Sequence, residues 1–167
     1  LTMLDLFWFA KNPRERIFKY VRFEDTPESE DFLKSQPAIC IGAHYGNWEI
    51  MGQATALAGV KIASIAAEIK NSSVNEMLIR RRQKTGQTII PQKGALRTLI
   101  ARLRQNEMVG FVLDQHTGSD EGGIQVEFLG MPMSVSSAPA ALAYRTGSKI
   151  ISGFCHADQR GHYLIRI

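Results

Sequence analysis

A histidine and a glutamate five positions apart are the first residues of this chain that could do chemistry together. His44 and Glu49 lie in the segment 38–50, where an apolar run ends in a turn of small residues before a helix begins. Histidine titrates near neutral pH and can remove the proton of a hydroxyl that attacks a carbonyl. A carboxylate on its other ring nitrogen fixes the tautomer and stabilises the imidazolium. The spacing therefore predicts a general base, His44, oriented by Glu49.

The surroundings of this pair, more than its spacing, favour the interpretation. His116 and Glu121 have the same spacing, but they lie in a polar loop with no helix to fix the acid. Asn47, in contrast, is a suitable N-cap for a helix that carries Glu49 in its first turn, where the helix dipole stabilises an anion. We therefore expect the first pair to be the functional one.

Other catalytic motifs are missing from the sequence. The chain has no Gly-x-Ser-x-Gly nucleophile motif and no glycine-rich phosphate loop, and its histidines do not have metal-ligand spacing. We accordingly expect neither a cofactor nor a bound metal. The two cysteines, Cys40 and Cys155, lie in apolar strand-like runs and are expected to be reduced and buried, as is typical of a cytosolic setting.

Composition and charge bound the class of protein. The chain has 167 residues, of which 44% are hydrophobic and 22% charged, and this predicts one globular domain. Residues 70–104 hold nine Lys and Arg against one Glu, a local charge of +8 that leaves −4 for the rest. Such a region either attracts acidic partners, such as phosphate groups, an acidic protein or an anionic membrane, or forms solvated helix faces. No nucleic-acid-binding motif accompanies it.

Strand-like and helical runs alternate after residue 37, which predicts an α/β fold with a mostly parallel (mixed) central sheet and helices on both faces. The expected strands are 38–42, 61–66, 88–90, 108–113, 123–128 and 149–154, and the expected helices are 14–20, 27–34, 47–58, 73–85, 95–104 and 137–146. The aromatic segment 1–10 is expected to form a helix, packed on the core or lying in a membrane interface. Residues 163–167 have the pattern of a strand.

The helix at 73–85 raises a question about its arginines. Its apolar stripe continues into Arg81 and Arg82, so that one of them either points into a cleft or extends to solvent.

Four blocks, in this order, resemble those of the lipid A biosynthesis acyltransferases, the late lauroyl and myristoyl transferases. His44 to Glu49 resembles the His-x4-Glu motif of that family. The later blocks are Arg82 to Gly86 with 89–91, Val112 to Gln115, and 123–130 followed by the helix from Pro139.

The resemblance implies a fold like that of the glycerol-phosphate acyltransferases and direct O-acyl transfer by His44 and Glu49. The implied donor is the acidic acyl-carrier protein, and the implied acceptor is a lipid A precursor or related glycolipid at a membrane surface. The implied substrate-binding residues are Arg82 or its neighbour Arg81, Asp114 at a strand end, Asn47 and Gly130. From the residues alone, Asp114 is equally well explained as a structural cap or turn residue, Asn47 is expected to cap the helix, and Gly130 is expected to serve the turn geometry.

We therefore expect residues 1–167 to be a single catalytic domain, a piece that lacks its membrane anchor and C-terminal end, at the cytoplasmic face of the bacterial inner membrane. Two alternatives remain open at this point. The chain could act on another phospholipid or glycolipid, or it could be a non-catalytic domain that binds anionic lipid or an acidic protein through its basic region.

Overall fold

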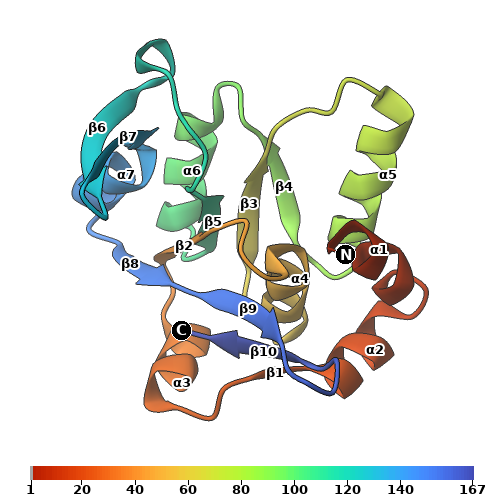
Figure 1. The fold of residues 1–167 in the computed structure, drawn as a ribbon. Helices are drawn as coiled ribbons and strands as arrows, with labels where there is room; N and C mark the ends of the chain where they lie inside the picture. The colour runs from red at the N-terminus through yellow and green to blue at the C-terminus, as the bar shows by residue number, and fades with distance from the viewer. Residues whose placement is uncertain (1) are drawn as a thin grey trace.

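The computed structural model describes residues 2–167 and consists of a five-stranded parallel sheet, a three-stranded sheet and a two-stranded hairpin, with helices packed around them (Figure 1). The helices are α1 (Thr2–Phe9), α2 (Pro13–Tyr20), α3 (Pro27–Lys34), α4 (Trp48–Leu57), α5 (Ser72–Gln83), α6 (Ala95–Arg104), α7 (Ala138–Thr146) and the 3₁₀ turn η1 (Ser119–Glu121). The strands are β1 (Val21–Phe23), β2 (Ala38–Gly42), β3 (Ile62–Ala66), β4 (Thr88–Pro91), β5 (Met108–Val112), β6 (Gly123–Phe128), β7 (Met131–Ser136), β8 (Lys149–Ser152), β9 (Phe154–Ala157) and β10 (Tyr163–Arg166).

The large sheet has the strand order β4-β3-β5-β2-β8, with every pair parallel. This confirms the predicted α/β class. The finer resemblance to glycerol-phosphate acyltransferases stays a prediction. Strands β2 and β5 are far apart in sequence but adjacent in the sheet, and Gly42 at the end of β2 is in register with Val112 at the end of β5. The chain segments that leave these two strands therefore emerge side by side.

Alternate residues of the central strands face two separate cores. Cys40 packs with α4 and the small sheet in one buried cluster, whereas its neighbour Ile39 packs with α6 and α7 in another. The expectation of helices on both faces is thus confirmed, because each buried strand presents apolar side chains alternately to either side.

One expected element differs in the structure, and another is confirmed. The run predicted as one strand, 149–154, is divided at Gly153 into β8 in the large sheet and β9 in the small one. A Cβ at Gly153 would lie 3.3 Å from the backbone oxygen of Arg166, so a larger residue there would press on the neighbouring chain. The segment predicted from 163 is β10, the central strand of the small sheet, between β1 and β9.

The N-terminal segment forms α1, and its Leu6 and Phe9 are buried in the protein core. Leu4, Phe7 and Trp8 remain exposed. Among residues 2–167, no helix has both the length and the apolar character needed to cross a membrane.

Candidate active site

His44 and Asp114 meet at the carboxyl edge of the large sheet. Each lies two residues beyond the paired strand ends Gly42 and Val112. The Nδ1 atom of His44 lies 2.7 Å from Oδ1 of Asp114, and the backbone N–H of His44 donates to Oδ2 at 2.9 Å. Both side chains are partly open to solvent, with 35% and 39% of their surface exposed. An ionised Asp114 accepts a hydrogen bond from Nδ1 of His44 when Nδ1 carries the ring proton. In that tautomer Nε2 has no proton and can act as a base.

Hydrogen bonds from His44 also set the ionisation of its partner. Partial burial raises the pKa of Asp114, but the hydrogen bonds from the ring and the backbone N–H of His44 outweigh it, and the net shift of the pKa is downward. Asp114 is therefore held in the charged form that an imidazolium at His44 requires.

The loop between His44 and α4 is fixed against the small sheet. Gly46 has a φ of +68° and bridges to Cys155, and a Cβ added at Gly46 would lie 1.9 Å from the Cys155 carbonyl oxygen. The next residue, Asn47, donates its backbone N–H to the same oxygen at 2.6 Å. Only glycine fits this close approach, which holds His44 in place relative to α4.

Asn47 is the N-cap of α4, as its position predicted. Its Oδ1 accepts the backbone N–H of Ile50 at 3.1 Å, and its Nδ2 donates to Asp5 of α1 at 3.1 Å. A role for Asn47 in substrate binding stays a prediction.

Glu49 lies in the first turn of α4 but is paired with Arg82. The guanidinium of Arg82 donates from Nε and Nη2 to the two carboxylate oxygens of Glu49, with the Nε bond at 2.9 Å. The Glu49 side chain is only 3% exposed and the Arg82 side chain 13%. Within the described residues, Glu49 makes no hydrogen bond to His44. The expected pairing of His44 with Glu49 is thus replaced in this structure by two pairs, because Asp114 follows the adjacent strand and reaches Nδ1 directly.

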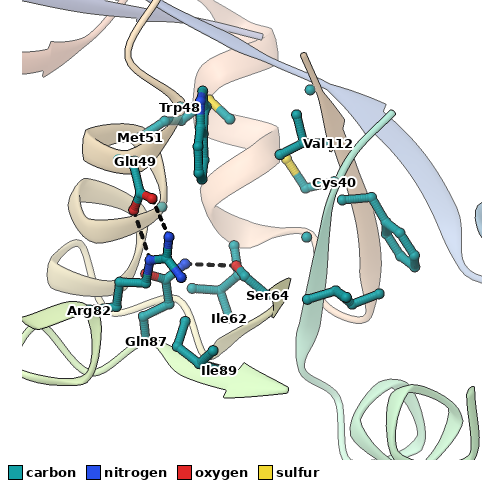
Figure 2. A pocket seen from close by; sticks show the side chains of 15 residues that line it. Cys40, Trp48, Glu49, Met51, Ile62, Ser64, Arg82, Gln87, Ile89 and Val112 are labelled. Atoms are coloured by element: carbon teal, nitrogen blue, oxygen red, sulfur yellow. Dashed lines mark hydrogen bonds and ion pairs between the residues drawn. The ribbon is translucent and has the colours of Figure 1, made fainter. Parts of the chain in front are cut away.

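Trp48 stands between the two pairs. Its ring packs edge-on against the His44 imidazole, with 5.1 Å between centroids, and the Arg82 guanidinium carbon lies 5.9 Å from the Trp48 ring centre. Trp48 also lines a pocket between α4 and the strands of the large sheet (Figure 2). Its lining includes Met51, Ile62, Ile65, Ile89, Phe111 and Val112, together with Glu49, Arg82 and the hydrogen-bonded pair Gln87 and Ser64.

The remaining predicted site residues lie apart from His44. Arg82, not Arg81, lines the pocket, and the guanidinium carbon of Arg81 instead lies 4.0 Å from the centre of the Phe7 ring of α1. Gly130 lies in the turn between β6 and β7 with a φ of +76°, where a Cβ would contact nothing within 4 Å. The structure gives Gly130 a turn geometry and places it outside the pocket, so that a substrate-binding role for it stays a prediction.

The sequence did not reveal the roles of Trp48 and Asp5. Trp48 belongs to the motif 44–49, but the motif does not indicate its contacts with His44 and Arg82. Nothing in a single sequence indicates that Asp5 contacts Asn47, which is 42 positions away. In the part of the chain that is described, no three His, Cys, Asp or Glu side chains come close enough together to bind a metal.

Comparison with known proteins places this geometry in context. The model of one protein family, the bacterial lipid A biosynthesis acyltransferases, matches residues 1–167. The chain is also 28% identical over 140 residues to the phosphatidylinositol mannoside acyltransferases of two strains of Mycobacterium tuberculosis. These alignments cover 78% of this chain and 44% of each relative, so that the chain spans less than half of their length.

Proposed function

Because the chain belongs to the family of bacterial lipid A biosynthesis acyltransferases, we propose that it transfers a fatty acyl chain from an acyl thioester to a hydroxyl group of a glycolipid. The observation that carries the proposal is the contact between His44 and Asp114 at the carboxyl edge of the parallel sheet. Ligands of open α/β sheets bind at this edge. A histidine with one nitrogen held by a carboxylate and the other unoccupied is suited to general base catalysis.

In the proposed reaction, Nε2 of His44 removes the proton of the acceptor hydroxyl as its oxygen attacks the thioester carbonyl. The tetrahedral intermediate collapses with cleavage of the carbon–sulfur bond, and the imidazolium returns the proton to the leaving thiolate. Asp114 keeps the proton on Nδ1 and stabilises the imidazolium charge. No acyl-enzyme is formed, because no nucleophilic side chain takes part.

Glu49 and Arg82 have a different part in this proposal. Arg82 is already bound by two hydrogen bonds to Glu49 and is nearly buried, so a phosphate of the acceptor would have to compete with that carboxylate. This favours Arg82 as a residue that lines the cleft. The apolar wall of the pocket, from Met51 to Phe111, is suited to an acyl chain, which gains free energy when its methylene groups leave water.

The basic region supports an acidic donor, and we propose acyl-carrier protein. Arg80 and Arg102 are ion-paired with Glu76 and Glu107, respectively. Arg82 is paired with Glu49, and Arg81 is half-buried. The five remaining cationic side chains of this region are exposed and, in the described structure, make no ion pair: Lys70, Lys84, Lys93, Arg97 and Arg104. Charges of one sign steer a partner of the opposite sign. We place the reaction at the cytoplasmic face of the bacterial inner membrane, where such a donor and a lipid acceptor meet.

The names of the family and of the relatives indicate the class of acceptor. The family name refers to lipid A and the relatives to phosphatidylinositol mannoside, and both are glycolipids. The acceptor class is therefore proposed as a glycolipid, with a lipid A precursor as the first candidate.

The test is an assay of the purified protein with acyl-carrier protein loaded with chains of several lengths and with a panel of glycolipid acceptors. We expect a mass increase of one acyl group on one acceptor. His44→Ala should reduce the rate by roughly 10²–10⁴-fold, the usual contribution of a general base. The matched control is His116→Ala, which removes an exposed histidine of the alternative pair. A His44→Ala enzyme with the wild-type rate would overturn the mechanism. Binding of the carrier protein without transfer to any acceptor would instead favour a binding domain.

A further inference from the structure

One carboxylate of the N-terminal helix reaches the loop that holds the candidate site. Oδ2 of Asp5 accepts two hydrogen bonds, from Nδ2 of Asn47 at 3.1 Å and from the hydroxyl of Tyr163 at 2.7 Å. Asp5 is the acidic residue of an otherwise apolar helix, whose Leu6 and Phe9 are buried in the core. The packing of these two side chains directs Asp5 towards α4 and β10 instead of towards open solvent.

Asp5 determines which way the Asn47 side chain faces. An asparagine amide presents an acceptor oxygen on one side and a donor nitrogen on the other. As a pure acceptor, the carboxylate selects the orientation in which Nδ2 faces Asp5 and Oδ1 faces the N–H of Ile50. The cap of α4 is therefore formed with the help of a residue on another helix.

Asn47 is the link from this contact to the site. It lies between His44 and Glu49, and its backbone N–H is bound to Cys155. A change in its position moves the end of the loop that carries His44 and the start of the helix that carries Glu49.

A second contact joins α1 to α5, the helix that carries Arg82. The ring of Phe7 lies under the guanidinium of Arg81, 4.0 Å away, and Arg81 is the neighbour of Arg82 on α5. Figure 1 shows α1 beside the end of α5 that carries these arginines. Helix α1 thus contacts both segments that supply Glu49 and Arg82.

We propose that Asp5 is a positioning residue for the acyl transfer, acting through Asn47 to hold His44 and α4 in the reactive arrangement. This inference rests on the proposed function and adds α1 to the site. Asp5 touches neither substrate nor the reacting atoms. Its contribution is geometric, and displacements of about 1 Å at a reacting group can cost roughly 100-fold in rate.

The experiment compares Asp5→Ala with Asp5→Asn, which retains an acceptor oxygen, and with Glu15→Ala as a matched control. Glu15 of α2 likewise accepts a hydrogen bond from an asparagine amide, that of Asn12, but this contact is exposed and does not involve Asn47. We expect Asp5→Ala to lower kcat by roughly tenfold or more per folded molecule, with KM changed less than twofold. Asp5→Asn should keep most of the rate, and Glu15→Ala should leave it unchanged.

A double-mutant cycle isolates the path through Asn47. Asn47→Ser retains an oxygen for the helix cap but removes the amide Nδ2 that donates to Asp5. If the two residues act together, the double variant Asp5→Ala/Asn47→Ser should be no slower than the slower single variant. Additive losses would overturn the proposed path. So would an Asp5→Ala rate that is explained by a smaller folded fraction, or an Asp5→Asn rate as low as that of Asp5→Ala.

A spectroscopic measurement separates this proposal from the proposed function. In protein labelled with ¹⁵N-histidine, Asp5→Ala should shift the ring resonances of His44, assigned with His44→Ala, while Glu15→Ala leaves them in place. A shift without any transfer by the wild type would refute the acyltransferase function but retain the coupling. Unshifted resonances would refute the coupling, whatever the activity.

Discussion

Two carboxylate pairs each take one member from residues 44–49, and they differ mainly in their access to water. His44 and Asp114 are more than one-third exposed, whereas Glu49 and Arg82 are almost completely enclosed. The exposed pair is open to a bound molecule, with which the proposed base, His44, would exchange a proton. The buried pair has its charges satisfied by each other and offers no free proton acceptor.

Burial also determines what each pair contributes to stability. Exposed ion pairs contribute about 0–1 kcal/mol, because water competes for both charges. Loss of one partner of a buried pair costs about 3–5 kcal/mol, because the other charge is left without a partner in a medium of low polarity. We therefore expect substitutions in the His44–Asp114 pair to affect mainly the reaction, and substitutions in the Glu49–Arg82 pair to affect mainly stability.

The largest expected effect is on stability, from Glu49→Ala. This change leaves the buried Arg82 guanidinium unpaired and should lower the free energy of unfolding by about 3–5 kcal/mol, measured by urea denaturation. Glu76→Ala is the control, since it breaks an exposed pair with Arg80 on the surface of α5. It should cost no more than about 0.5 kcal/mol. Equal losses for the two variants would mean that the Glu49 pair is not buried in solution.

Asp114→Asn should have the opposite profile. The amide can still accept the backbone N–H of His44, but it presents a donor to Nδ1 and so favours the tautomer that carries the proton on Nε2. We expect kcat to fall by roughly 100-fold or more, while the free energy of unfolding changes by less than about 1 kcal/mol.

The control for this variant is Asp120→Asn, which changes an exposed acid of the following loop and should leave both quantities unchanged. A large loss of stability in Asp114→Asn with an unchanged rate would reverse the assignment of the two pairs.

The sequence predicted the individual residues better than their partners. The strands and helices around His44 followed from apolar runs and cap residues, and Asn47 caps α4 as its position indicated. The partner of His44 could not be obtained in this way, because it depends on β5 lying next to β2. Spacing along the chain favoured Glu49, whereas the strand order brought Asp114 to the same edge.

The helix arginines illustrate the same limit. The apolar stripe of α5 indicated that either Arg81 or Arg82 faces inward. Adjacent side chains on a helix point in different directions, and the residues that surround them determine which one faces the cleft. Glu49 on α4 binds Arg82, and Phe7 on α1 covers Arg81. Both neighbours belong to other helices, and the sequence of α5 alone does not indicate them.

A smaller effect is expected at the cysteines, of which Cys40 reports on the buried pair. Burial raises the pKa of both Cys40 and Cys155 to about 12, so that neither thiol should react with a thiol reagent in the folded protein at pH 8. Cys40 lines the same pocket as Glu49 and Arg82. We expect Glu49→Ala to accelerate the labelling of Cys40, measured by peptide mapping, and Asp114→Asn to leave it slow. Fast labelling in the wild type would contradict the burial of the pocket.

The smallest expected effect is the pH dependence of the exposed pair. The pKa of Asp114 is lower in the folded chain than its ordinary value of about 3.9, so the ionised carboxylate stabilises the fold above that pH. This contribution is lost as the pH falls through the lower, folded pKa. The difference in free energy of unfolding between the wild type and Asp114→Asn, measured in urea at pH 7 and near pH 3, should therefore shrink on acidification. A difference that grew at low pH would require a raised pKa and a protonated Asp114, which could not hold an imidazolium at His44.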